Sequence, residues 1–100
     1  MQFIYVLKLI PRLLDQKSWT PREERIVETH FQYLKELTEA GTIILVGRTQ
    51  QMDEETFGIA IFEAATEEDA RRIMENDPAV QGGIMTAKLF SFRVALSRLS

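Results

Sequence analysis

Residues 42–63, TIILVGRTQQMDEETFGIAIFE, contain the stretch that decides the fold. Its two ends, 42–48 and 56–63, are continuous apolar runs rich in β-branched and aromatic side chains, which is the composition of strands. The polar residues 49–55 between them form a connection that is somewhat long for a hairpin. The segment therefore predicts two strands joined as a hairpin at the centre of the chain.

A helix is predicted on each side of this hairpin. Before it, TPRE at residues 20–23 supplies an N-cap, a first-turn proline and a capping-box glutamate, and Gly41 is the glycine expected just after a helix. After it, Thr66 is followed by three acids, which the helix dipole favours in a first turn. We expect the second helix to end at 77–78, because proline disfavours the α conformation in the residue before it.

Two more apolar runs, 2–10 and 84–94, predict the outer strands, while 11–19 shows no clear period. The order is therefore strand, helix, strand, strand, helix, strand. Two β-α-β halves of this kind make an α+β fold, the ferredoxin-like βαββαβ sandwich, with an antiparallel four-stranded sheet and both helices on one face. At 100 residues the chain is one domain, for which we expect bounds of 1–96 and a tail at 97–100.

Composition excludes several classes of site and partner. The chain has no cysteine and one histidine, which rules out disulfides, thiolate ligands and a metal site built from several histidines of one chain. Its net charge is -3 and its basic residues are scattered, so we expect no nucleic acid and no anionic membrane as partner. No apolar run approaches the roughly 20 residues of a membrane span. We expect a cytoplasmic protein with no metal and no cofactor.

The strands carry apolar residues on both faces of the predicted sheet. An antiparallel sheet with one solvated face alternates apolar and polar residues, and these strands do not. The opposed sets are Phe3, Tyr5, Leu7 and Leu9 against Ile4 and Val6; Ile43 and Leu45 against Ile44 and Val46; Phe57, Ile59 and Ile61 against Ala60 and Phe62; and Ile84, Phe90, Phe92 and Val94 against Met85, Ala87 and Leu89. We expect a homodimer through the exposed sheet face; the alternative is that 11–19 and the tail cover it.

The single histidine lies on the apolar side of the first helix. That apolar stripe consists of Ile26, Val27, Phe31, Leu34 and Leu37. His30 falls within the stripe and points toward the sheet, and Asp77 extends the apolar face of the second helix. A carboxylate beside an imidazole fixes its tautomer and raises the basicity of the other nitrogen, as a general base requires. The pattern leaves open a core histidine bonded to a backbone carbonyl and an aspartate that caps its own turn.

Three further side chains are candidates for contact with a substrate. Arg48, at the end of the second strand, either binds a carboxylate or is an ordinary strand-end charge. Tyr5 is either a hydrogen-bond donor in a pocket or a core aromatic with a satisfied hydroxyl. Trp19 precedes the cap of the first helix, where it is either a hydrophobic staple or a pocket lid.

These residues occur in the order and spacing of a known family. The matching stretches are HFQYL at 30–34, EAGTIILVGRT at 39–49 and DPAV at 77–80. Over about its whole length the chain resembles the YciI-like proteins, also called YCII-related domain proteins. The resemblance implies a dimeric α+β barrel with a pocket between helices and sheet, and it implies that His30 and Asp77 are the family's proposed His–Asp pair. Gly47 is commonly followed by proline in that family, whereas Arg48 follows it here.

The leading hypothesis for function is a small-molecule enzyme. The resemblance implies lyase, isomerase or dehydrohalogenase chemistry on small ring compounds. Asp77 orients His30 as general base, Arg48 or a backbone amide steadies the resulting anion, and Arg48, Tyr5 and Gly47 are the expected substrate-binding residues. Two alternatives stay open, namely a non-catalytic dimer that binds a small ligand in the same pocket and a haem-handling protein with His30 as axial ligand.

Overall fold

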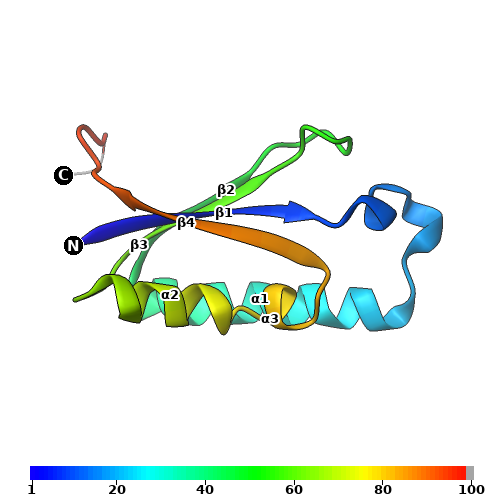
Figure 1. Ribbon diagram of the computed structural model, residues 1–100, viewed down its shortest axis with the longest axis horizontal. Helices are drawn as coiled ribbons and strands as arrows, with labels where there is room; N and C mark the ends of the chain where they lie inside the picture. The colour runs from blue at the N-terminus through cyan, green and yellow to red at the C-terminus, as the bar shows by residue number, and fades with distance from the viewer. Residues whose placement is uncertain (99–100) are drawn as a thin grey trace.

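The strands and helices predicted from the sequence follow each other in the same order in the computed structural model, which describes residues 1–98 (Figure 1). The elements are β1 (Gln2–Leu9), the short 3-10 helices η1 (Pro11–Leu14) and η2 (Gln16–Ser18), α1 (Pro21–Glu39), β2 (Ile43–Arg48), β3 (Gly58–Glu63), α2 (Glu67–Glu75), the short α3 (Pro78–Gln81) and β4 (Met85–Phe92). The predicted tail 97–100 includes positions 99 and 100, which lie outside the described residues.

The four strands form one antiparallel sheet in the order β2-β3-β1-β4. Each half of the chain supplies one strand to the centre, where β1 and β3 pair. The helices α1, α2 and α3 lie on one face of this sheet, as Figure 1 shows. None of the helices in residues 1–98 is long and apolar enough to cross a membrane. The α+β, ferredoxin-like βαββαβ sandwich expected from the element order is confirmed.

The core lies between the sheet and the helices. Phe3, Tyr5 and Leu7 alternate along β1 and are no more than 5% exposed. Tyr5 and Phe62 meet edge to face with ring centroids 5.6 Å apart. Such a pair contributes about 0.5–1.5 kcal/mol beyond the burial of its area. The alternation predicted for β1 is therefore confirmed, and it places Tyr5 on the helix side of the sheet.

β2 departs from the regular alternation predicted for it. Ile43 pairs with Phe62 but Leu45 pairs with Ile61, because the register shifts between these two positions of β2. Paired residues share a face, so Ile43 is 3% exposed on the helix side and Leu45 is 46% exposed on the other side. The prediction that Ile43 and Leu45 share a face is wrong. The same shift turns Arg48 toward the helix side, where it pairs with a glycine of β3.

The second helix ends earlier than predicted. α2 stops at Glu75 with Asn76 as its C-cap, and Asp77 is the N-cap of the separate helix α3. Pro78 suits the first turn of α3, because the N–H that proline lacks has no helical partner at that position. Asp77 therefore begins a new turn and does not end the old helix, which corrects the predicted boundary.

The segment 11–19 packs at one end of the helix layer. A second buried cluster, against which Trp19 packs, consists of Leu13, Ala79 and Ile84. Leu13 brings η1 against this cluster, so the segment does not cover the other sheet face (Figure 1). Ile84 precedes β4 and joins the cluster, whereas the sequence pattern groups it with Phe90, Phe92 and Val94 on one side of the last strand.

The sheet face opposite the helices is apolar and open. Leu45, Phe90 and Phe92 on this face are 46%, 50% and 39% exposed. Ile4 pairs with Phe90, so the two apolar side chains lie next to each other across β1 and β4. This is the feature on which the expected homodimer depends.

Candidate active site

A histidine and an aspartate from distant parts of the chain meet between α1 and the start of α3. Nδ1 of His30 lies 2.6 Å from Oδ1 of Asp77, which is hydrogen-bond distance. The His30 side chain is 12% exposed and that of Asp77 is 0% exposed. The helical phase of α1 directs His30 inward, and the cap geometry of α3 presents the carboxylate to it.

Asp77 also accepts hydrogen bonds from two other donors. The Tyr5 hydroxyl donates to Oδ2 at 2.8 Å, and the backbone N–H of Ala79 donates to Oδ1 at 2.9 Å. The second of these bonds is the N-cap of α3. Asp77 therefore caps its own turn and contacts His30 at the same time, so the two roles that the sequence pattern leaves open for it are compatible.

These three contacts assign the tautomer of His30. A carboxylate only accepts hydrogen bonds, so in the neutral imidazole the proton shared with Asp77 belongs to Nδ1; this assignment follows from the hydrogen-bond network. Burial, and then the negative charge of Asp77, raise the pKa of Tyr5, so its hydroxyl keeps its proton and donates. Nε2 of His30, without a hydrogen-bond partner in residues 1–98, is then the free basic nitrogen.

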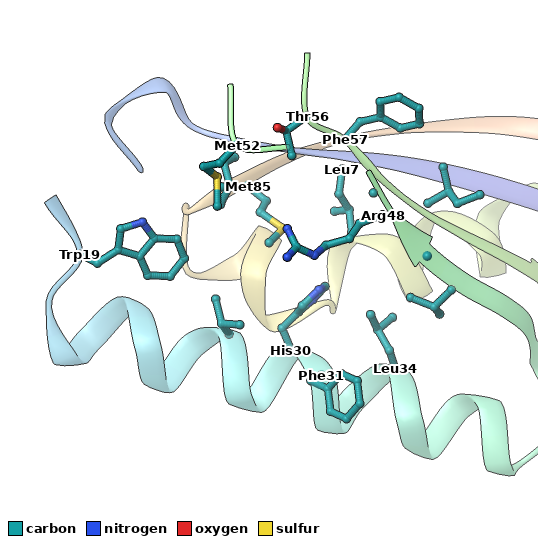
Figure 2. A pocket seen from close by; sticks show the side chains of 16 residues that line it. Leu7, Trp19, His30, Phe31, Leu34, Arg48, Met52, Thr56, Phe57 and Met85 are labelled. Atoms are coloured by element: carbon teal, nitrogen blue, oxygen red, sulfur yellow. The ribbon is translucent and has the colours of Figure 1, made fainter. Parts of the chain in front are cut away.

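His30 opens onto a cavity of about 510 Å³ between α1 and the sheet. Figure 2 shows the imidazole pointing from α1 into this space. Aromatic and methionine side chains of the wall are Trp19, Phe31, Met52, Phe57 and Met85. A neighbouring hollow of about 340 Å³ shares Trp19 and Met52, so these two side chains lie between the two spaces. The main cavity has the size and the lining that suit a small, mostly apolar molecule.

Of the predicted substrate-binding residues, Arg48 and Gly47 lie at the cavity with His30, and Tyr5 does not. Arg48 and Gly47 form part of the wall at the end of β2. In Figure 2 the Arg48 side chain extends into the cavity above His30. Tyr5 is 0% exposed and outside the cavity wall, and its hydroxyl contacts Asp77. Tyr5 therefore reaches the site through Asp77.

Most of the cavity wall is not predicted from the sequence, and Phe31 and Met52 are two examples. Phe31 belongs to the predicted apolar stripe of α1, yet it is 66% exposed and lies at the cavity. Met52 comes from the polar connection between β2 and β3, which gives no local sign of a pocket. The position of Phe31 directly after His30 is the one signal in the sequence that points to it.

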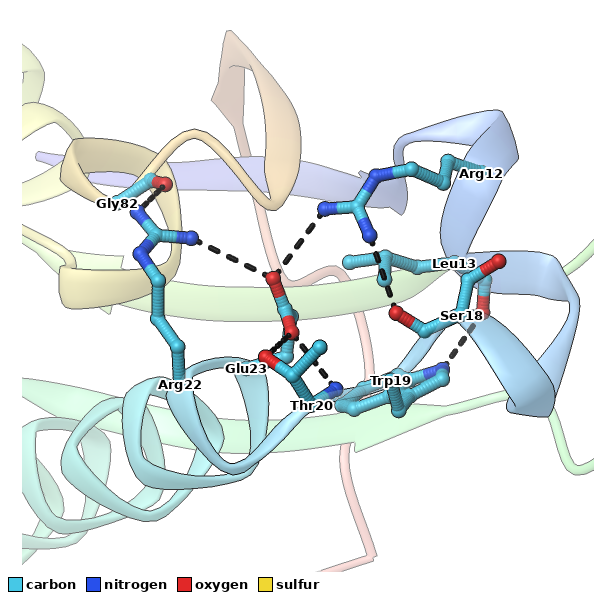
Figure 3. A network of polar contacts seen from close by, with 8 residues as sticks. All are labelled: Arg12, Leu13, Ser18, Trp19, Thr20, Arg22, Glu23 and Gly82. Atoms are coloured by element: carbon cyan, nitrogen blue, oxygen red, sulfur yellow. Dashed lines mark hydrogen bonds and ion pairs between the residues drawn. The ribbon is translucent and has the colours of Figure 1, made fainter.

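Beside the cavity a network of polar contacts is centred on Glu23, and the Trp19 indole N–H donates to the Leu13 carbonyl at 2.8 Å (Figure 3). The Glu23 carboxylate, 3% exposed, accepts from the Thr20 N–H at 2.8 Å and from the Thr20 hydroxyl. It also pairs with Arg12 at 3.2 Å and with Arg22 at 3.5 Å. The hydrogen bonds from Thr20, and then the one from Arg12, lower the pKa of Glu23 from 4.5 to about 2. The predicted capping box is present and orders the segment that carries Trp19.

The fold and the site define a class of protein. It is a small α+β sandwich in which a buried aspartate lies behind an imidazole, and the imidazole opens onto an apolar cavity. Within the described chain, no three His, Asp or Glu side chains gather as a metal-binding group. The chain belongs to the YCII-related domain family, whose model matches residues 1–93. The family resemblance noted in the sequence is confirmed.

A solved structure with the same fold is 5-chloro-2-hydroxyhydroquinone dehydrochlorinase (TftG) from Burkholderia phenoliruptrix AC1100, in complex with 2,5-dihydroxybenzoquinone. It is similar to this chain at 22% sequence identity and a TM-score of 0.69, over 93% of this chain and 94% of that chain. No curated protein matches the chain. At this identity the likeness to TftG shows a shared fold.

Proposed function

We propose that the protein is a small-molecule enzyme whose general base is His30, oriented by Asp77. The observation that carries the proposal is the 2.6 Å contact between Nδ1 of His30 and Oδ1 of a fully buried Asp77. With the proton on Nδ1, the lone pair of Nε2 faces the cavity. Proton abstraction from a bound molecule requires this arrangement.

The proposed step removes a proton from an acidic carbon of a small cyclic compound. Nε2 of His30 takes the proton, and the electron pair of the broken C–H bond moves toward the neighbouring carbon. In an elimination this pair forms a C=C bond as chloride leaves with the C–Cl electrons. In an isomerisation His30 returns the proton to a different carbon. Both reactions are redox-neutral, so neither requires a cofactor.

Asp77 supports this step through its charge as well as its geometry. The imidazolium that forms on proton transfer lies 2.6 Å from the Asp77 carboxylate. Because Asp77 is fully buried, water and salt screen this attraction little. Asp77 therefore stabilises the charged form of His30 in which the proton has left the substrate.

The comparisons support the choice of reaction type. The solved relative TftG is named as a dehydrochlorinase of 5-chloro-2-hydroxyhydroquinone and holds 2,5-dihydroxybenzoquinone. We therefore propose lyase, isomerase or dehydrohalogenase chemistry on a small ring compound for this chain. The apolar wall and the volume of about 510 Å³ are compatible with such a substrate.

Two assays test the proposal, namely chloride release from 5-chloro-2-hydroxyhydroquinone and deuterium uptake from D2O into a panel of cyclic ketones and enols. We expect turnover or exchange by the wild type, and rates lower by about 10²–10⁴-fold for His30→Ala and His30→Gln. Gln32→Ala, on the exposed side of α1, is the matched control and should keep wild-type rates. Full activity of His30→Ala would contradict the assigned role.

The alternative is a non-catalytic protein that binds a small ligand in the same cavity. The volume and the apolar wall favour binding whether or not a reaction follows. The ligand 2,5-dihydroxybenzoquinone separates the two functions. If it raises the melting temperature equally in wild type and Asp77→Asn, and if no compound of the panel loses chloride or takes up deuterium, the binding function is the correct one.

We also propose that a second copy of the chain covers the open sheet face. One apolar row crosses all four strands of this face through successive pairs, namely Phe90, Ile4, Ile61 and Leu45. Phe90 and Leu45, at the two ends of the row, are 50% and 46% exposed. A two-fold axis through the face would set one such row against its copy, which buries both.

Light scattering tests this dimer. We expect the wild type to have twice the mass of one chain at micromolar concentration, and Phe90→Glu to have the mass of one chain, because a carboxylate at the row would be buried without a partner. Arg71→Glu, on the exposed side of α2 and away from this sheet face, is the control and should stay dimeric. A monomeric wild type at these concentrations would contradict the proposal.

A further inference from the structure

Among residues 1–98, one permanently charged side chain lines the cavity, that of Arg48. His30 is the other titratable residue of the wall, and none of the described residues that line it is an aspartate or glutamate. The Arg48 guanidinium forms no hydrogen bond or ion pair with any of residues 1–98. Its N–H donors are therefore available to a ligand. The chain has a net charge of -3, but this cavity carries a positive charge when His30 is neutral.

Two local features of the sheet direct Arg48 into the cavity. The register shift between Ile43 and Leu45 reverses the faces of the residues that follow, so Arg48 pairs with Gly58 on the helix side. Gly58 has no side chain there, and a Cβ built on it would lie 3.6 Å from the Arg48 Cβ. The space beside the Arg48 stem is therefore open, and Figure 2 shows the side chain lying across the sheet toward the cavity.

The surroundings of Arg48 define which ligand group would complement it. Leu7 and Met85 are among the apolar side chains that share the wall with it. Arg48 is exposed at the rim of the cavity, so its guanidinium can pair with an anionic oxygen group of a ligand that enters from solvent. Its planar fork matches a carboxylate with two parallel hydrogen bonds. The rest of the wall favours an apolar body for the same molecule.

We propose that Arg48 is a specificity-determining residue, which selects small, mostly apolar ring compounds that carry one carboxylate. The inference rests on the function proposed above and narrows its substrate class. Arg48 holds the carboxylate while Nε2 of His30 faces an acidic C–H of the same molecule, and apolar side chains of the wall contact the ring. Neutral or cationic rings of the same size bind more weakly, because they leave Arg48 unpaired or repel it.

Binding of benzoate, benzamide and benzylamine, measured by calorimetry or NMR titration, tests the inference. We expect the wild type to bind benzoate at least about tenfold more tightly than benzamide, and benzylamine weakest. Arg48→Gln should remove the preference for benzoate. Arg48→Lys should keep part of it, because lysine retains the charge but lacks the planar fork. Arg25→Gln removes an exposed charge of α1 outside the cavity wall, so this control should keep the full preference.

The same titrations in the His30→Ala background separate this inference from the proposed function. There we expect the benzoate preference to persist, because binding needs Arg48 but not the general base. If no substrate is ever turned over, that persistence still supports Arg48. Equal binding of benzoate and benzamide by the wild type, or a benzoate preference that survives Arg48→Gln, would overturn the inference. Tighter binding of 2,5-dihydroxybenzoquinone than of benzoate would also overturn it, since a ring oxyanion and not a carboxylate would then be preferred.

Discussion

Asp77 and Glu23 are both buried carboxylates at the start of a helix, but the groups around them differ in kind. Asp77 is 0% exposed as the N-cap of α3, and Glu23 is 3% exposed in the first turn of α1. The sequence predicts Glu23 as a capping-box residue, and for Asp77 it leaves open a cap of its own turn and a partner of His30. What separates them is whether their partners are fixed charges or a group that exchanges a proton.

Glu23 is surrounded by partners whose charge and protonation do not change. It accepts hydrogen bonds from Thr20 and pairs with Arg12 and Arg22, whose side chains are 50% and 55% exposed. Arginine does not lose its charge in proteins, so the charge of Glu23 is compensated at every ordinary pH. This cluster joins the segment 11–19 to α1, and none of the contacts of Glu23 is with His30 or Asp77.

Asp77 contacts a side chain that can gain and lose a proton. Two of its donors, Tyr5 and the Ala79 backbone, are neutral and fixed, and the third is the imidazole of His30. That imidazole has a second nitrogen on the cavity side. A carboxylate beside such a group fixes which nitrogen carries the proton, and a carboxylate held by arginines has no such role.

Asp77→Asn is the change with the largest expected effect on turnover. Asparagine keeps the N-cap of α3, so the fold should persist. With its amide oxygen in the place of Oδ1, it still accepts from the Ala79 N–H and from Nδ1–H of His30, but it lacks the negative charge that stabilises the imidazolium formed on proton transfer. We expect turnover to fall by about 10²–10⁴-fold with a small change in melting temperature. If folded Asp77→Asn loses less than tenfold in turnover, Asp77 has no greater part in the reaction than Glu23, and the proposed difference between the two carboxylates is wrong.

Tyr5→Phe should have an intermediate effect. It leaves Oδ2 of Asp77 without a partner in a fully buried site, which lowers the free energy of unfolding by about 1–3 kcal/mol. Turnover should fall by no more than about tenfold, because the contact with His30 is kept.

Tyr33→Phe is the matched control for Tyr5→Phe. Burial, and then the charge of Asp77, raise the pKa of Tyr33 to about 12, so it is a neutral donor like Tyr5. Its hydroxyl donates to the Ile73 carbonyl at 2.7 Å and not to Asp77. We expect chemical denaturation to show a loss of stability for Tyr33→Phe without a loss of turnover. Equal turnover losses in the two variants would argue against a specific role for Tyr5.

Glu23→Gln should have the smallest effect on turnover. Glutamine keeps the size of the side chain but leaves Arg12 and Arg22 without their counter-charge, so we expect a lower melting temperature and an unchanged rate. A rate loss as large as that of Asp77→Asn would show that the cluster at Glu23 belongs to the site. Calorimetry and the turnover assay on the same preparation decide this.

The pH dependence of the melting temperature tests the structural role assigned to Glu23. The folded-state pKa of Glu23, about 2, lies below its ordinary 4.5, so its contribution is fully present above pH 4.5 and is lost as pH falls toward 2. We expect the melting temperature of the wild type to exceed that of Glu23→Gln most near neutral pH. This difference should shrink between about pH 4.5 and pH 2. A difference that stays constant over this range would contradict the assignment.

The fold could largely be predicted because its signals are local. The caps at residues 20–23, the glycine after α1 and the apolar runs each depend on a few neighbouring residues, and Gly41 has the positive φ of 85° that this position requires. The register shift in β2 depends on pairing with β3, which no pattern within 42–48 encodes. That shift is also what turns Arg48 toward the cavity.

The site could be predicted in part. Helical phase is a local property, and it indicates that His30 points inward and that Asp77 follows the apolar face. The bond between Tyr5 and Asp77 depends on how β1 lies beneath α3, and these two residues are 72 positions apart in the chain. The place of Phe31 at the cavity, instead of in the core, depends equally on tertiary packing.

The tautomer of His30 is the most direct test of the account, and the chain has one histidine, so its ¹⁵N signals need no assignment among several. Long-range ¹H–¹⁵N correlation spectra at neutral or mildly alkaline pH distinguish the two neutral forms. We predict the Nδ1–H form in the wild type, with Nε2 unprotonated. An Nε2–H form in the wild type would contradict the claim that Asp77 prepares His30 as a base.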